Sequence, residues 1–141
     1  AIGNMVYHSV KAAQQLSKEG IEAEVVNMRF VKQIDGALIE EICHRFKYIL
    51  TVEDHVISGG FGSAVLECMN ARNITNVHVK VHGLPNDFVE HGTPAELHTM
   101  LRLDADGIAV VTKEFLQMML KHHGAVALTQ KVLPTLTKHY I

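Results

Sequence analysis

The 141-residue sequence contains no tryptophan, three prolines and only two cysteines. Cys43 and Cys68 each lie among apolar residues of an expected helix, and their spacing matches no metal-binding motif. So few cysteines favour a reduced protein, and a cytoplasmic location is the simplest interpretation.

The sequence also lacks a strong charge of either sign and a long apolar run. Thirteen Lys and Arg residues face fifteen Asp and Glu, and no basic stripe is visible, so nucleic acid is not an expected partner. No apolar run approaches the roughly 18 residues of a membrane span, and the first residues do not read as a signal peptide. The 48% of hydrophobic residues and 20% of charged residues are typical of one soluble globular domain.

Apolar periodicity predicts helices and strands in alternation. Helices are expected over about 4–19, 35–46, 63–72, 93–101 and from 104 to Gly124, and strands over 21–28, 48–52 and 77–81. The expected N-caps include Asn4, Asp35 and Thr93, the last in a capping box with Glu96, and Gly20 is expected to end the first helix. This order predicts an α/β fold, a three-layer sandwich with a mainly parallel sheet. Residues 1–124 would form the domain and residues 125–141 a tail of uncertain structure. Ala1 to Gly3 reads as the end of a truncated first strand, so the sequence is expected to be a fragment.

The most conspicuous stretch joins an apolar strand to a glycine-rich turn and a helix. Such a stretch lies at the carboxyl edge of an α/β sheet, where ligands and partners tend to dock. The candidate interface or anion loop consists of Glu53, Asp54, His55, Gly59, Gly60, Gly62 and Ser63.

Two interpretations of this loop stay open. The glycines could form a tight turn that lets the helix sit close to the sheet, or the helix N-terminus could bind an anion or a partner. At least one of the three glycines is expected to have a positive φ, and the free N–H groups of Phe61 to Ala64 are expected to point outward. The glycine spacing is not that of a dinucleotide fingerprint, and Ser63 does not stand in a nucleophile elbow. A carboxylate beside His55 could be a general base with its orienting group, but loop polarity or a domain contact is favoured.

Ten histidines raise the question of a metal site. The two close pairs are His78 with His82 and His122 with His123, and neither brings a third ligand at suitable spacing. Solvated histidines are therefore the favoured interpretation, and no metal is expected.

Several phrases of the sequence occur in a specific order. They are AIGNMV at 1–6, VVNMRFVK at 25–32, TVEDH at 51–55, GGFGSAV at 59–65, GLPNDFVEHGT at 83–93 and LRLDADGI at 101–108. Together they resemble the last domain of thiamine-diphosphate enzymes of the transketolase type. The last two phrases are similar to the 1-deoxy-D-xylulose-5-phosphate synthase family, over about residues 1–117. Gln33 departs from the family, which usually has proline there.

The resemblance implies a parent enzyme that condenses pyruvate with glyceraldehyde 3-phosphate and releases CO2, using thiamine diphosphate and Mg²⁺. The family holds this cofactor in its first two domains, and the Gly-Asp-Gly motif involved is absent from this sequence. The resemblance therefore implies no catalytic, cofactor-binding or metal residue here. It implies a domain that packs on upstream domains of the same polypeptide and contributes to a homodimer. The alternatives are the equivalent domain of a 2-oxoacid dehydrogenase beta subunit and a free-standing module that binds an anion or a partner.

Overall fold

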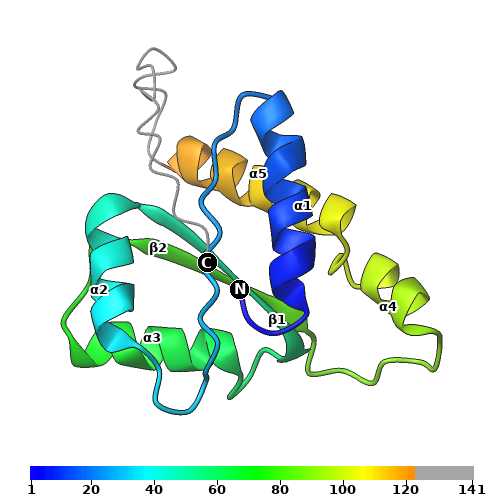
Figure 1. Cartoon of the computed structure of the whole chain (residues 1–141), viewed down its shortest axis with the longest axis horizontal. Coiled ribbons are helices and arrows are strands. Elements are labelled where there is room, and N and C mark those ends of the chain that lie inside the picture. Colours follow the sequence, from blue (N-terminus) through cyan, green and yellow to red (C-terminus); the bar gives the residue numbers. More distant parts are fainter. Residues whose placement is uncertain (123–141) are drawn as a thin grey trace.

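The computed structural model describes residues 1–122, so the expected domain end at 124 and the tail at 125–141 lie outside the described residues. Figure 1 shows the arrangement of the helices around two strands. The helices are α1 (Met5–Lys18), α2 (Gly36–Arg45), α3 (Phe61–Ala71), α4 (Pro94–Met100) and α5 (Ala105–His122), and the strands are β1 (Tyr48–Val56) and β2 (His78–Leu84).

The two strands form a parallel sheet. Tyr48 pairs with His78 and Val52 with His82, and the register then shifts before Val56 pairs with Leu84. The α/β class is confirmed, but the sheet within residues 1–122 has two strands instead of the longer sheet that the sequence predicts. Parallel strands need a crossover, which α3 provides here.

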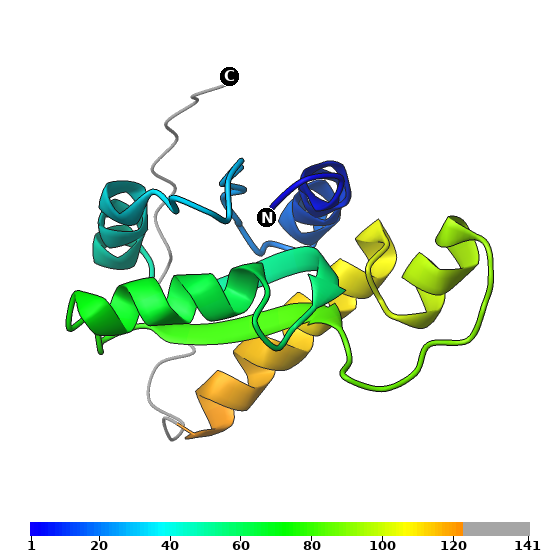
Figure 2. The same ribbon diagram turned by 90° about the horizontal axis from the view of Figure 1, so that it is seen from below.

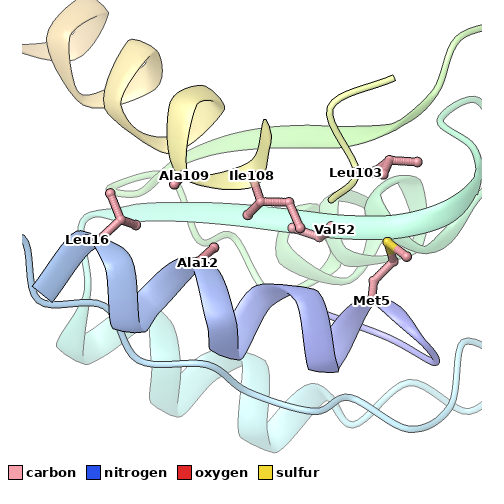
Figure 3. Packing of buried hydrophobic residues seen from close by; sticks show 7 residues of the cluster. All are labelled: Met5, Ala12, Leu16, Val52, Leu103, Ile108 and Ala109. Carbon is pink, nitrogen blue, oxygen red and sulfur yellow. The ribbon is translucent and has the colours of Figure 1, made fainter. Parts of the chain in front are cut away.

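Helices pack on both faces of β1, because alternate side chains of a strand point to opposite faces. Val52 lies in a buried cluster with residues of α1 and α5, and Leu50 packs against it. Ile49, which points to the other face of the strand, packs against a second cluster built from α2 and α3. Figure 3 shows the first cluster, formed by Met5, Ala12, Leu16, Val52, Leu103, Ile108 and Ala109.

The strand predicted over 21–28 is not formed as a regular strand. Within residues 1–122, this extended segment forms sheet-like backbone hydrogen bonds with Ala1 alone. The Ala1 nitrogen donates to Val26 O at 2.9 Å, and the Ala1 carbonyl accepts from Met28 N at 3.1 Å. On the other side, Ile2 N donates to Val52 O at 3.2 Å. The predicted strand is not formed because a strand requires a neighbour along its length, and among residues 1–122 only Ala1 and Ile2 lie between this segment and β1.

The helix ends follow the predicted capping residues in two cases and depart in one. The Asp35 side chain accepts from Leu38 N, and Thr93 with Glu96 forms a capping box, as predicted. Gly20 follows α1 with φ +81°, the left-handed conformation that glycine adopts readily. Asn4 precedes α1, but its side chain does not cap the helix and is used elsewhere.

The alternation in 77–81 predicts a strand with one face in water, and this is wrong for most of β2. All residues of β2 after His78 are half-buried. His82 Nε2 lies 2.7 Å from Arg102 O, because the loop after α4 covers this face. No helix in residues 1–122 has the length and apolar content that crossing a membrane requires.

Candidate functional site

The candidate loop begins inside a strand. β1 continues to Val56, so Glu53, Asp54 and His55 belong to the strand and not to the loop that the sequence predicts. Because strand residues alternate, Asp54 faces the opposite side of the strand from Glu53. Glu53 is 1% exposed, whereas Asp54 and His55 are exposed.

The carboxylate of Glu53 binds the N-terminus of α3. Its Oε2 accepts a hydrogen bond from Phe61 N at 2.6 Å, and its Oε1 accepts one from Gly62 N at 2.8 Å. These are two of the backbone donors that a helix leaves without an intrahelical partner at its first turn. The helix dipole favours a negative charge at this position. The N-terminus of α3 therefore stabilises the buried carboxylate, and the carboxylate in turn fixes the first turn of α3.

This geometry corrects the expectation that the N–H groups from Phe61 to Ala64 point outward. Phe61 and Gly62 donate inward to Glu53, and Ala64 N donates to Gly60 O within the helix. The chain's own carboxylate thus takes the position that an external anion would need at this helix.

Two of the glycines are required by close packing and not by unusual backbone angles. A Cβ on Gly60 would meet the Glu53 carboxylate and would lie 2.5 Å from Val56 O. A Cβ on Gly62 would meet the Val81 side chain and would lie 2.7 Å from Thr51 Oγ1. The tight-turn interpretation therefore accounts for both residues, since they let α3 approach β1 and β2.

Gly59 provides the positive φ that the sequence predicts for at least one of the three glycines, at +73°. The Ser63 hydroxyl closes the same turn, because it accepts from Gly59 N at 3.0 Å and donates to Ile57 O at 2.8 Å. Asn86 Nδ2 donates to Ser58 Oγ at 2.6 Å and ties the loop after β2 to this turn. Ser63 therefore has a structural role in the turn.

Asp54 lies on the opposite side of the strand from Glu53 and joins three elements. Its Oδ2 accepts from Asn4 Nδ2 at 2.9 Å and lies 3.1 Å from Nε2 of His98 on α4. The His8 and His98 rings meet edge to face, with centroids 5.5 Å apart. The hydrogen bond from Asn4 lowers the pKa of Asp54, and the neighbouring His98 and the charge of His8 lower it further. Through its contacts with Asn4 and His98, Asp54 links the start of α1 and the middle of α4 to the end of β1.

No spacing in the sequence indicates Asn4 or His98 as a partner of Asp54, because they lie 50 and 44 residues away. His55 is exposed, and its Nδ1 lies 3.1 Å from the backbone oxygen of Val56. The arrangement of a base with its orienting carboxylate is therefore formed by His98 and Asp54 and not by His55.

The described residues do not fit thiamine diphosphate and Mg²⁺. No group of three or more His, Cys, Asp or Glu side chains in residues 1–122 could hold a metal ion. The helix N-terminus that could receive a diphosphate is already bound by Glu53. The contacts that these side chains make are buried hydrogen bonds to α3 and hydrogen bonds that close the turn before it.

Three large aromatic side chains are exposed where segments leave the carboxyl edge of the sheet. Tyr7 is 65% exposed in the first turns of α1, Phe30 is 67% exposed after the extended segment, and Phe88 is 94% exposed after β2. Each follows the carboxyl end of a strand or an extended segment parallel to it, so all three belong to one edge. Exposed aromatic residues are enriched in protein interfaces.

Comparisons of the sequence with a family pattern and with individual proteins indicate the same family. The sequence pattern of the family "Transketolase, C-terminal domain" matches residues 1–108. The 1-deoxy-D-xylulose-5-phosphate synthase of Syntrophus aciditrophicus is 43% identical over 118 residues, which cover 84% of this chain and 18% of that protein. The synthase of Desulforudis audaxviator is 48% identical over 108 residues, covering 77% of this chain and 17% of that protein. The chain thus spans less than a fifth of the length of these relatives.

The structure also resembles a solved one, described as "Split gene transketolase, inactive beta4 tetramer". The TM-score is 0.74 and the sequence identity 32%, and the match covers 82% of this chain and 37% of that chain.

Proposed function

The chain belongs to the transketolase C-terminal domain family, and we propose that it serves as the C-terminal domain of a 1-deoxy-D-xylulose-5-phosphate synthase. The observation that carries the proposal is the identity of 43–48% to synthases of two organisms over most of this chain. The parent would join pyruvate to glyceraldehyde 3-phosphate with loss of CO2, using thiamine diphosphate and Mg²⁺ bound by its other domains.

Within this parent, the domain would pack on the upstream domains and contribute to a homodimer. The exposed Tyr7, Phe30 and Phe88 support this role, since they offer large apolar contacts at one edge of the sheet.

A domain replacement tests the proposal. The region of the Syntrophus aciditrophicus synthase that matches this chain would be exchanged for this chain, and formation of 1-deoxy-D-xylulose 5-phosphate and sedimentation of the dimer would be measured. We expect an active dimer. A matched control carries Phe88→Ser, which exchanges an exposed aromatic side chain and should weaken the dimer while leaving the unfolding of the isolated chain unchanged. A folded but inactive monomer in the unsubstituted exchange would contradict the proposal.

We also expect the isolated chain not to bind thiamine diphosphate. Titration calorimetry with the cofactor and Mg²⁺ measures this directly. Micromolar binding by the isolated chain would show that cofactor contacts lie in this domain after all.

A further inference from the structure

Two short loops at the carboxyl edge of the sheet share one pattern but carry opposite charges. The basic loop is residues 29–32, with the sequence Arg-Phe-Val-Lys, and it follows the extended segment. The acidic loop is residues 87–90, with the sequence Asp-Phe-Val-Glu, and it follows β2. In Figure 1 both lie on the lower side of the molecule, as the light-blue loop before α2 and the yellow-green loop before α4, and Figure 2 also keeps them apart.

The basic loop is exposed over its whole length, with Phe30 67% and Val31 42% exposed. Two residues in left-handed conformations bound its apolar part, Arg29 with φ +57° and Gln33 with φ +64°. Phe30 N donates to Met28 O at 2.6 Å across Arg29, which makes a γ-turn of the rare, strained form. Such strained positions cluster where a chain contacts other molecules, so this turn points to an interaction surface.

The acidic loop is anchored on both sides and exposed between its anchors. Asn86 Nδ2 donates to Ser58 Oγ directly before the loop, and the capping box of Thr93 with Glu96 follows it. Both acidic residues of the loop are exposed, and Phe88 is 94% exposed. A loop whose ends are already fixed loses little freedom on binding, which favours its use in an interface.

The charges of the two loops match in either direction along the chain. Each loop has two adjacent apolar residues between two charges of one sign, so opposite charges meet whether the loops run parallel or antiparallel. None of the ion pairs formed within residues 1–122 uses a side chain of either loop. Like charges keep a loop from pairing with its own counterpart, whereas the basic and acidic loops attract each other.

We infer that the basic loop of one chain packs against the acidic loop of a second copy, and that the reciprocal pair forms at the same time across a twofold axis. This inference rests on the proposed function, in which the domain contributes to a homodimer, and it assigns the residues that make the contact. In a twofold interface both subunits use the same surface, so the pair of loops occurs twice. The apolar residues would form the centre of each contact, and the charges its rim.

A second copy is favoured over other partners because it satisfies both loops at once. Nucleic acid would be repelled by the acidic loop, and a partner of one uniform charge would be repelled by one loop or the other. A partner for both loops needs opposite charges at two matching places, and a copy of this chain rotated by 180° has them. Because the two contacts are small, we expect the association of isolated chains to be weak and sensitive to salt.

Charge reversal followed by mixing tests the inference. The first variant carries Arg29→Glu with Lys32→Glu, so both of its loops are acidic, and the second carries Asp87→Lys with Glu90→Lys, so both of its loops are basic. Sedimentation of the 141-residue chain at low salt should show a dimer, and each variant alone should dimerise at least about tenfold more weakly. An equimolar mixture of the two variants should recover the association, because every acidic loop then meets a basic loop.

The matched control reverses Lys18 and Lys121, two exposed residues at the C-terminal ends of α1 and α5, and should dimerise like the unsubstituted chain. Chemical denaturation of every variant separates a loss of association from a loss of folding.

Failure of the two folded variants to associate on mixing would overturn the inference, and so would an unsubstituted chain that stays monomeric. The domain replacement measures the proposed function separately. An active exchanged synthase together with a monomeric isolated chain would leave that function standing and remove the pairing of the loops.

Discussion

Replacing Glu53 with glutamine should destabilise the domain strongly, although the two side chains have nearly the same shape. Each carboxylate oxygen of Glu53 accepts one backbone N–H of α3, and the side chain is 1% exposed. In Glu53→Gln one oxygen becomes an NH2 group, which cannot accept. Phe61 N or Gly62 N then faces a donor and has no water to replace the lost partner.

The magnitude follows from two contributions. A buried donor left without an acceptor costs about 1–3 kcal/mol. Loss of the negative charge at the start of α3 removes a further contribution of about 0.3–2 kcal/mol. We therefore expect the free energy of unfolding to fall by roughly 2–4 kcal/mol, a large part of the 5–15 kcal/mol typical of a domain.

Chemical denaturation followed by circular dichroism measures this loss. Glu67→Gln is the matched control, because Glu67 lies on the same helix and is exposed. The control should unfold within about 0.5 kcal/mol of the unsubstituted chain. If Glu53→Gln and Glu67→Gln unfolded at the same denaturant concentration, the buried carboxylate would not be what anchors α3.

The structure also predicts the effects of four other substitutions. Gly62→Ala should lower the free energy of unfolding by about 1–3 kcal/mol, because the new methyl group would meet Val81, whereas Gly92→Ala, whose nearest contact would be 3.2 Å away, should be close to neutral in the same denaturation assay. Thr93→Ala should cost about 1 kcal/mol through loss of the capping box, and an unchanged denaturation midpoint would contradict this. Asp54 has a lowered pKa, so its contribution to stability is present above the unfolded value of 3.8 and is lost as pH falls through the folded pKa. The difference in unfolding free energy between the unsubstituted chain and Asp54→Asn should therefore be larger at pH 7 than at pH 3.

Local signals in the sequence predicted much of the fold. The capping residues Asp35 and Thr93 and the left-handed Gly20 depend on neighbours within a few positions, and the structure confirms all three. The expected strand at 21–28 failed because strand formation depends on a partner distant in the sequence. Its apolar residues fit a buried strand, but its backbone pairs only with Ala1 among the described residues.

The site was predictable in its glycines and not in its polar contacts. Close packing of α3 on the sheet explains Gly60 and Gly62, which the tight-turn interpretation anticipated. The partners of Asp54 come from α1 and α4, and no spacing in the sequence indicates that these helices meet at the end of β1.

The role of Glu53 shows why a glycine loop before a helix does not by itself indicate an anion site. The same free N–H groups that attract a phosphate also attract a carboxylate of the chain. Here the strand that leads into the loop places Glu53 eight residues before Phe61 and on the face toward α3. A charged residue on the buried face at the end of a strand, followed by glycines and a helix start, therefore favours internal capping. An external anion becomes the better interpretation when that position is apolar, because the helix donors then have no partner within the chain.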